Sequence, residues 1–530
     1  MATRLTAFSK FFITLLILGV IAGGGYYLLN KTSFGSNLKQ KADETKKDDN
    51  TSKTEPQKTN FNDDENTLVV QLVTWGGYGP GLYFNEGATP NENSRFFKEY
   101  GFKVRFVLEN DLINAMNAWI ADDYDVAVQT ADAFPLYTGP ADINQYKPKA
   151  FMQVDWSRGG DAIIVKRGIN SVNDLKGKKI AVAVPSPAQT LLTTALEAAN
   201  LKYSDVEVVK TTDNLKAAQL FRSPDVDAAV VWSPDDILAT KDVPGSKTLL
   251  NTKTESHVIA DIFFAKESFL NSHRDMINGF YQGWMKAVAE LKANPDNRAK
   301  AGKYLAELNG LGVEDAMGMM DVVYWTSHGD NMNFFGMNPD YRGQRGEDLY
   351  TKMSKNFVIT GDAEKEAPSW RSAIFTGAVQ AGNDVLTGPT FAAEASKTFT
   401  PPTAEEKNAP SIATKPVSIN FASGKFQLDE NAKTIIDFQF ADVSKSFAHS
   451  RIRIEGNTDN VGSKQMNMDL SRKRAQAVAD YLASQFKIDK NRFVIIGNGP
   501  DNPVPGCEQN QDDACKAKNR RTDFQVIGNN

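Results

Sequence analysis

The sequence predicts an α/β protein made of several units, with one N-terminal transmembrane helix. Short apolar runs typical of buried strands alternate with helical stretches, which is the pattern of parallel α/β sheets. An uncharged apolar run, Phe11–Leu29, is just long enough to cross a bilayer core of about 30 Å. Two polar segments separate the globular blocks. A chain of 530 residues corresponds to about three to five domains.

The composition excludes several classes of protein. Apolar residues make up 41% of the chain and charged residues 24%, close to the averages of soluble globular proteins. The net charge of −5 gives no reason to expect nucleic-acid binding. We recognise no nucleophile elbow, phosphate-binding loop or pair of catalytic carboxylates. We therefore expect a protein that is not an enzyme and that uses no cofactor.

We interpret residues 1–30 as an anchor that is retained in the inner membrane. Arg4 and Lys10 precede the apolar run, so the positive-inside rule places the N-terminus in the cytoplasm and the bulk of the chain in the periplasm. The alternative is a cleaved signal peptide, but the run is long for one, and large residues from Tyr26 onward follow the glycines. The run contains no acid, which argues against ion conduction by this chain.

Two polar segments divide the rest of the chain. Residues 31–66 consist mainly of Lys, Asp, Glu, Thr, Asn and Gln and cannot bury enough surface to fold, so we expect a disordered tether. Residues 388–415 contain several prolines and are expected to be a linker. The predicted domains are therefore 67–387 and 416–530.

In the central block, apolar strands end at loops that are rich in small and polar residues. The expected strands are Leu68–Thr74, Asp125–Val128, Lys179–Val184 and Val226–Trp232. Ser186 precedes Pro187 and stands three residues before Gln189, which predicts a helix N-cap, and Ser233 repeats the arrangement. Ligands of open α/β sheets lie beyond the carboxyl ends of strands. The caps are therefore expected to line a pocket as well.

The stretch GINSVNDLKGKK at 168–179, followed by the strand at 179–184 and by VDAAVVWSPD at 226–235, resembles periplasmic solute-binding proteins. These are the proteins of the nitrate, sulfonate, taurine and thiamine-precursor type, which serve ABC importers. The resemblance covers about 67–387 and implies a bilobed periplasmic-binding-protein fold, type II-like, with a small solute held between two lobes. The solute-binding residues that it implies are Trp75, Gly76, Tyr78, Thr130, Asp132, Ser186 and Trp232, with Asp161 and Asp261 near probable crossovers.

Two points in this block stay open. Trp75 either stacks on a solute or closes the core of the sheet. The loop ends carry Asp132, Asp235 and Asp236, with only Arg158 as a nearby base, which slightly favours a neutral or cationic solute. We interpret residues 321–335 as a late helix and its loop, and a lid over the solute is the alternative.

The C-terminal block has a clear strand and helix pattern. Arg451–Glu455 alternates like a half-buried strand, and Lys464–Phe486 is expected to be a helix. Ala475, Val478 and Leu482 mark its buried face by their spacing. Two further strands are expected at 493–496 and 524–527.

The motifs EGNTDN at 455–460, NMDLSRKRA at 467–475, GNG at 497–499 and NRR at 519–521 resemble the OmpA-like peptidoglycan-binding domain, an α+β domain. The resemblance implies a site for the diaminopimelate end of a stem peptide, whose ammonium faces an Asp and whose carboxylate faces an Arg. The matching residues are Asp459 and Arg474, flanked by Thr458 and Asn467, with Arg520 and Arg521 as the terminal arginines. The alternative is a structural ion pair between Asp459 and Arg474.

The chain departs from this family at two positions: Asn457 stands where a His is usual, and Ala422 follows Phe421 where an Asp is usual. Cys507 and Cys515 lie in one loop of a chain that we expect to be exported, so we predict a disulfide. The four histidines are scattered along the sequence, so we expect no metal site.

These features predict a membrane-anchored periplasmic solute-binding protein that serves an ABC-type importer and also binds peptidoglycan. One alternative is a solute sensor or a stator-like subunit that links an inner-membrane complex to the cell wall. The expected partners are peptidoglycan, a small solute, the membrane, and an inner-membrane permease or a motor or transducer subunit, but no nucleic acid. An envelope tether without a ligand and an enzyme are the remaining alternatives.

Overall fold

The computed structural model describes residues 65–528, apart from positions 185, 234, 420 and 423. The anchor predicted at 1–30 and nearly all of the tether predicted at 31–66 lie outside the described residues. Within the described part, no helix is both long enough and apolar enough to cross a membrane.

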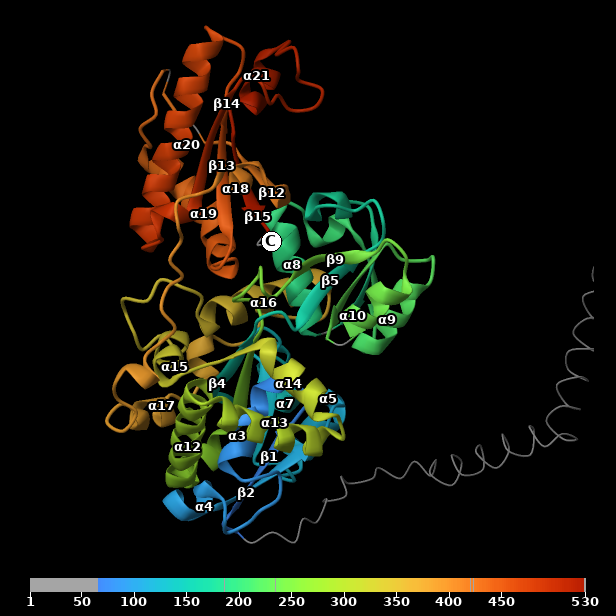
Figure 1. Ribbon diagram of the computed structural model, residues 1–530, viewed down its shortest axis with the longest axis vertical. Coiled ribbons are helices and arrows are strands. Elements are labelled where there is room, and N and C mark those ends of the chain that lie inside the picture. Colours follow the sequence, from blue (N-terminus) through green and yellow to red (C-terminus); the bar gives the residue numbers. More distant parts are fainter. Residues whose placement is uncertain (1–64, 185, 234, 420, 423, 529–530) are drawn as a thin grey trace, which may run out of the picture. The chain divides into compact units, whose positions relative to one another are not determined.

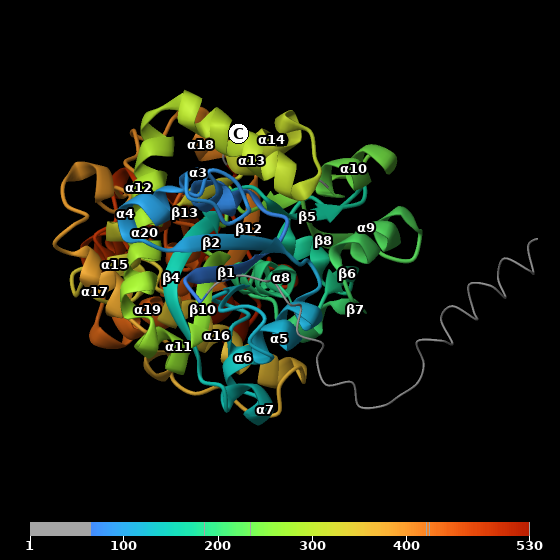
Figure 2. The same ribbon diagram turned by 90° about the horizontal axis from the view of Figure 1, so that it is seen from below.

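The first lobe is built on a sheet with strand order β11-β4-β10-β3-β1-β2 (Figure 1). In Figure 2, β1 and β2 lie between helix α13 on one side and helix α5 on the other. The strands are β1 (Thr67–Leu72), β2 (Lys103–Leu108), β3 (Val126–Thr130), β4 (Pro148–Ser157), β10 (Ala260–Lys266) and β11 (Val323–Trp325). The helices are α3 (Gly79–Phe84), α4 (Arg95–Tyr100), α5 (Leu112–Ile120), α6 (Pro135–Thr138), α7 (Ala141–Asn144), α11 (Glu267–Ser272), α12 (Arg274–Ala293), α13 (Pro295–Asn309), α14 (Val313–Asp321), α15 (His328–Phe334), α16 (Gly346–Thr360) and α17 (Gly377–Gly382).

The second lobe, green in Figure 1, is inserted between β4 and β10 and has the strand order β7-β6-β8-β5-β9. Its strands are β5 (Asp161–Val165), β6 (Lys179–Ala183), β7 (Glu207–Thr211), β8 (Ala228–Trp232) and β9 (Lys247–Asn251). Its helices are α8 (Pro187–Ala198), α9 (Asn214–Arg222) and α10 (Asp235–Asp242). The predicted strands at 125–128, 179–184 and 226–232 correspond to β3, β6 and β8.

The chain crosses between the lobes twice, at residues 158–160 and 252–259. The prediction of a bilobed α/β fold is therefore confirmed. The sheets are mixed rather than purely parallel, because the strands that enter and leave the lobes run against their neighbours. β10 pairs antiparallel with β3 and β4, and β5 pairs antiparallel with β8 and β9. β11 also pairs antiparallel with β4, whereas the other pairs, such as β1 with β2 and β6 with β7, are parallel as expected.

Each lobe has its own apolar core. In the first lobe, the fully buried aromatic side chains of Trp119, Phe263, Phe264 and Trp284 pack between the sheet and its helices. In the second lobe, the two faces of the sheet contribute to separate clusters, one under α9 and one under α8 that continues into the buried residues of the C-terminal domain. Burial of such side chains stabilises by about 1.5–3 kcal/mol each. These cores hold the strand ends at the crossovers in place.

The C-terminal domain is an α+β unit whose sheet has the order β12-β15-β13-β14. Its elements are α18 (Ala404–Asn408), β12 (Ser411–Val417), α19 (Glu430–Ser446), β13 (Arg451–Asn457), α20 (Lys464–Phe486), β14 (Phe493–Gly499), α21 (Asp513–Asn519) and β15 (Thr522–Ile527). Helix α20 has the predicted bounds, and Ala475, Val478 and Leu482 on it are fully buried. At Gly456 of β13, an added Cβ would lie 2.2 Å from the backbone oxygen of Ser471, so the strand and α20 touch through the glycine.

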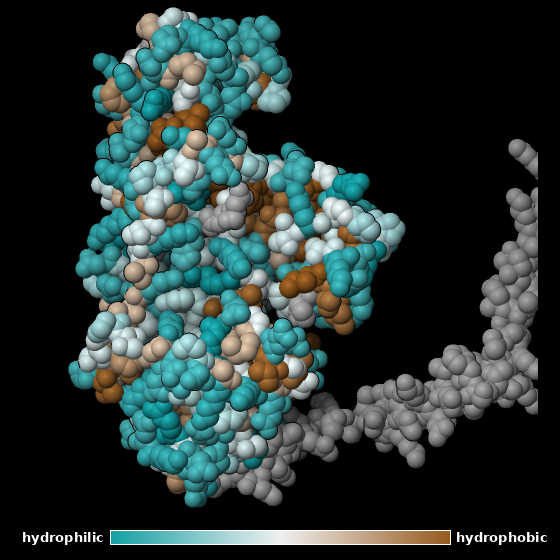
Figure 3. Space-filling model, viewed as in Figure 1, coloured by the Kyte–Doolittle hydropathy of each residue, from teal (hydrophilic) through white to brown (hydrophobic). Residues whose placement is uncertain are grey.

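The segment predicted as a linker, 388–415, carries short helical turns and contacts its surroundings. Arg451 forms an ion pair with Glu406 at 2.6 Å, and the amide of Phe399 donates to Asp489 at 2.8 Å. Strand β12 begins at Ser411, before the predicted domain start at residue 416. The face shown in Figure 3 is mostly hydrophilic with scattered apolar patches.

Candidate functional site

Four buried carboxyl groups meet where the chain crosses between the lobes. Asp132 follows β3, Asp155 lies near the end of β4, Asp161 begins β5, and Asp261 is the second residue of β10. Asp155 and Asp261 stand opposite each other in the β4–β10 ladder, and Thr130 stands opposite Asp261 on the other side. The four residues are 0–7% exposed. Three of them were singled out from the sequence, and the structure brings them together with Asp155.

Each carboxyl group accepts a hydrogen bond from a neighbouring side chain. Tyr78 donates to Asp261 at 2.6 Å, and Ser157 donates to Asp161 at 2.6 Å. The indole N–H of Trp75 donates to Asp155 at 3.1 Å. Thr190, on α8 of the second lobe, donates to Asp132 of the first lobe at 2.5 Å. The last of these contacts joins the two lobes directly.

Burial raises the pKa of all four carboxyl groups. It raises the pKa of Asp132 to about 6 and that of Asp161 to about 7. The pKa values of Asp155 and Asp261 are raised by burial and by the charges of neighbouring acids, including Asp261 next to Asp155. The same acids, after burial itself, raise the pKa of Tyr78 well above 10. The site therefore holds several carboxyl groups that resist ionisation in the absence of a cation.

Two glycines let the first loop approach these acids. An added Cβ at Gly77 would lie 1.7 Å from Oδ2 of Asp155, and one at Gly160 would lie 2.3 Å from the ring of Trp75. Trp75 is half-buried, and its ring rests on the crossover backbone. Gly76 and Tyr78 belong to the 3-10 turn η1 (Gly76–Tyr78) and are buried. The first strand-end loop thus lies beside the carboxyl groups, as the resemblance implies.

Three other predicted residues have structural contacts that account for them. The Ser186 side chain accepts from the amide of Ala188 and donates to the carbonyl oxygen of Ala183, so it caps α8 as predicted. Trp232 ends β8 opposite Asp161, and its backbone is bonded to Asn214. Thr130 is buried and bonds to Gln129. The proposal that these residues line the solute site rests on their position alone.

Sequence reasoning missed Asp155 and Thr190. Asp155 lies in β4, which was not among the expected strands, although apolar and polar residues alternate from Met152 to Ser157. The sequence signal that could have revealed Asp155 is the acid itself, since an Asp within a buried strand is seldom tolerated without a partner. Thr190 lies in the first turns of α8 and had no distinguishing feature.

Polar contacts also join α8 to the far end of α16. Gln189 donates to Asp362 at 2.9 Å, and Lys210 pairs with the same carboxylate at 2.8 Å. Lys352 pairs with Glu197 at 2.5 Å. These contacts, with the bond between Thr190 and Asp132, hold the lobes against each other.

The predicted peptidoglycan residues come from three segments: Thr458 and Asp459 follow β13, Asn467 and Arg474 lie on α20, and Arg520 and Arg521 precede β15. Asp459 forms an ion pair with Arg520 at 2.7 Å, and the amide of Val461 donates to its other oxygen. Arg474 is buried on α20, donates to the carbonyl oxygen of Lys425 at 3.0 Å and lies over the ring of Phe421. Burial lowers the pKa of Arg474, and Asp459 acts against this. Among the described ion pairs, Asp459 thus pairs with Arg520 rather than with Arg474.

The remaining residues of this group support the loop. Asn467 donates to the carbonyl oxygens of Asp459 and Val461, and Thr458 donates to the carbonyl oxygen of Asp459. Arg521 pairs with Asp523 at 2.9 Å and so does not face Asp459. Half of the Arg520 side chain is exposed, which leaves donors for an external carboxylate.

The predicted disulfide is confirmed. Cys507 and Cys515 are bonded to each other, and both are buried in the loop that leads through α21 to Arg520.

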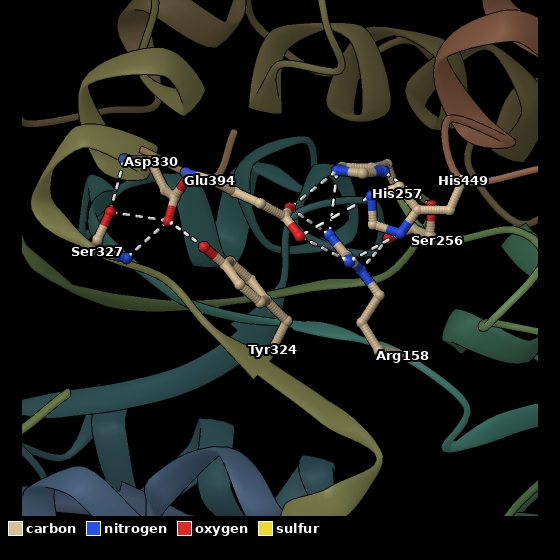
Figure 4. A network of polar contacts seen from close by, with 8 residues as sticks. All are labelled: Arg158, Ser256, His257, Tyr324, Ser327, Asp330, Glu394 and His449. Carbon is tan, nitrogen blue, oxygen red and sulfur yellow. Dashed lines mark hydrogen bonds and ion pairs between the residues drawn. The ribbon is translucent and has the colours of Figure 1, made fainter. Parts of the chain in front are cut away.

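A second polar cluster surrounds Arg158 in the first crossover (Figure 4). Its guanidinium donates to both oxygens of Glu394, to His257 at 3.1 Å and to His449 at 3.2 Å. Burial and the nearby Arg158 lower the pKa of both histidines, that of His449 to about 3. His257 belongs to the second crossover, and His449 to the C-terminal domain. The cluster therefore connects both crossovers to the domain that follows.

Three members of this cluster, His257, Glu394 and His449, form the one group of possible metal ligands in the described part of the chain. Their ligand atoms lie within 4.8 Å of one another. Because His257 and His449 are far apart in the sequence, the sequence alone did not predict that they lie close together. The place of a cation is taken by the Arg158 guanidinium.

Comparison with known proteins identifies two regions. The NMT1/THI5 like family model matches residues 92–298, and the OmpA family model matches residues 420–520. The taurine-binding periplasmic protein of Escherichia coli is 27% identical over 202 residues, which are 37% of this chain and 61% of that protein. An outer membrane protein of Haemophilus influenzae is 32% identical over 130 residues, 23% of this chain, and the match spans 36% of that protein.

Among solved structures, the periplasmic aliphatic sulphonate binding protein of Escherichia coli matches with a TM-score of 0.45 and 18% identity, covering 64% of this chain and 98% of that chain. On the two family matches, the chain contains a region similar to the NMT1/THI5 like family, followed by a region similar to the OmpA family.

Proposed function

We propose that the protein captures a small solute between its two lobes for an ABC-type importer and binds peptidoglycan through its C-terminal domain. The observation that carries the proposal is the meeting of Asp132, Asp155, Asp161 and Asp261 at the two crossovers. Burying several acids costs stability, so their retention at one place points to a binding role. The taurine-binding relative, a periplasmic protein by its name, supports a role in solute capture. Catalysis has no comparable support.

The wall-binding part of the proposal rests on the OmpA family match and on the arrangement around Asp459. The ammonium of a diaminopimelate residue would bind Asp459, and its carboxylate would bind Arg474 and the exposed donors of Arg520. Thr458 and Asn467 would hold the Asp459 loop in place. Arg521, which already pairs with Asp523, would support β15 rather than touch the ligand.

The location follows from the same reasoning. We propose an envelope protein whose residues 1–30 anchor it in the inner membrane and whose residues 31–66 are a tether. The solute-binding domain would be 67–387, the linker 388–415 and the wall-binding domain 416–530. A tether of that length would average roughly 30–35 Å as a flexible coil. Both binding domains would then act in the periplasm.

The second candidate is a sensor or stator-like subunit, and the Arg158 cluster favours it. Arg158 and His257 lie in the two crossovers about which the lobes would move, and both touch Glu394 and lie beside His449. A change at the crossovers on solute binding would therefore reach the wall-binding domain. Purification of the full chain with its membrane partner separates the candidates: a multi-span permease would support import, and a motor or transducer subunit would support sensing.

The wall-binding proposal is tested by sedimentation with purified peptidoglycan. We expect the full-length protein to appear in the pellet and Asp459→Ala or Arg474→Ala to stay in the supernatant. Asp480→Ala and Arg472→Ala are matched controls, because both residues are exposed on the same helix as Arg474. If the Asp459 and Arg474 variants sediment to the same extent as the wild type, the proposed site is wrong.

A further inference from the structure

We propose that the solute is an organic cation and that its ammonium group is held between the lobes by Asp132 and Asp155. This inference rests on the proposed solute-binding function and names the chemical class of the solute. The partners that it requires are all among the described residues at the crossovers.

The first argument is the balance of charge. Asp132, Asp155, Asp161 and Asp261 are almost fully buried, and no ion pair among the described residues joins any of them to a Lys or Arg. A buried carboxylate without a partner is costly, so such groups are normally paired or bound to a cation. Arg158, which lies between Asp155 and Asp161 in the sequence, is committed to Glu394. A positively charged solute would supply the missing partner.

The second argument is that two carboxylate oxygens at the site have no hydrogen-bond partner. Oδ2 of Asp132 accepts from Thr190, and Oδ2 of Asp155 accepts from Trp75. The Oδ1 atoms of both residues are buried and have no partner. Carboxylate oxygens accept hydrogen bonds and cannot donate them when ionised. These free acceptors therefore fit a ligand that carries N–H donors.

An anion does not fit this arrangement. A sulfonate or nitrate group would have to lie among four acids with no base paired to them. A single metal ion does not fit either. In the described part of the chain, the group whose ligand atoms lie within 4.8 Å of one another is His257, Glu394 and His449, which excludes the four acids. Among the described residues, no three of the four acids bring their oxygens within that distance of one another.

Trp75 adds an aromatic surface at the same place. Its indole N–H is bonded to Asp155, its ring rests on Gly160, and part of the ring stays exposed. Trp is the side chain that attracts cations most strongly through its ring face. An ammonium that approaches Asp155 would pass beside this ring.

The test is thermal unfolding of the full-length protein at pH 8 with a panel of solutes. The cations are 1,4-diaminobutane, ethylamine and trimethylamine, which carry N–H groups when protonated, the zwitterion is taurine, and the anions are methanesulfonate and nitrate. We expect at least one cation to raise the Tm by about 5 °C at a hundredfold excess over its Kd, and the anions to leave it unchanged.

Asp155→Asn and Asp132→Asn then test the residues. Each replacement keeps the acceptor for Trp75 or Thr190 and removes the charge. We expect the cation to shift the Tm of neither variant, while the solute-free Tm of each is at least that of the wild type. Asp242→Asn is the matched control, because Asp242 is an exposed acid of the second lobe that pairs with Arg222. It should keep the full shift.

Three results would overturn the inference. If an anion shifts the Tm and no cation does, the class is wrong while the proposed solute binding stands. If both Asn variants keep the cation shift, the assigned residues are wrong. If no solute of any class shifts the Tm, the proposed solute binding itself falls, and the inference falls with it.

Discussion

Asp155 and Asp261 show how far the proposed solute site depends on single residues. They face each other across β4 and β10, and like charges in that position destabilise a sheet. Asp261 was predicted from its place near a crossover, whereas Asp155 lies in β4, a strand that was not expected from the sequence. Apolar and polar residues alternate from Met152 to Ser157, but alternation marks a strand and not a functional residue. Only the three-dimensional pairing reveals that the two acids belong to one site.

The raised pKa values predict how stability depends on pH. Asp161 and Asp132 have folded pKa values of about 7 and about 6, above the unfolded value of roughly 3.9. As the pH falls from 8 to 5.5, the folded state takes up protons that the unfolded state does not. The solute-free protein should therefore gain stability, with a slope of at most about 1.4 kcal/mol per pH unit for each group.

Urea unfolding of the wild type and of Asp161→Asn at pH 8 and pH 5.5 measures this effect. His257 and His449 act in the opposite direction, because their lowered pKa values cost stability below a pH of about 6.5. The difference between the two proteins isolates Asp161. It should be largest at pH 8, where the variant is the more stable one, and an equal difference at both pH values would contradict the burial of an ionised Asp161.

The Arg158 cluster gives a second prediction for single residues. Because the guanidinium occupies the place of a cation, Zn²⁺ should not change the Tm of the wild type. Arg158→Ala should leave two histidines and a carboxylate facing one another, which is a ligand set that zinc accepts. We expect Zn²⁺ to raise the Tm of Arg158→Ala but not that of Arg158→Ala combined with Glu394→Gln. A rise in the Tm of the wild type on addition of Zn²⁺ would show that the guanidinium does not fill the site.

At the scale of elements, local sequence patterns were reliable where they were strong. Helix α20 has the predicted bounds because Ala475, Val478 and Leu482 give it a clear buried face. The cap at Ser186 and the strands β3, β6 and β8 were also predicted. Helix α19 and strand β12 were not. β12 contains Pro416 and lies at the edge of its sheet, where a proline is tolerated but weakens the strand pattern.

The disulfide gives a prediction for one element. It ties the loop at Cys507 to Cys515 in the first turn of α21, the helix that leads to Arg520. Replacing Cys507 and Cys515 together by Ser should lower the unfolding free energy of the C-terminal domain by about 2–3 kcal/mol, from the larger entropy of the open unfolded chain. Reduction of the wild type by dithiothreitol should give the same loss in urea unfolding. Equal stability of the oxidised wild type and the double variant would refute a structural role.

At the scale of the whole molecule, contacts between distant segments could not be predicted. Arg158 and Glu394 are 236 positions apart, and Arg158 and His449 are 291 apart. No local pattern connects such residues, since the contact exists only after both domains have folded. The two family resemblances agree with the family matches, but each resemblance concerns one region and gives no information about contacts between the regions.

The central claim is that one chain holds a cationic solute and the cell wall at the same time. Sedimentation with purified peptidoglycan in the presence of the radiolabelled amine chosen by the thermal panel tests it directly. We predict protein and label together in the pellet for the wild type, protein without label for Asp155→Asn, and both in the supernatant for Asp459→Ala. Wild-type protein that sediments without label, or label that sediments equally with Asp155→Asn, would contradict the account.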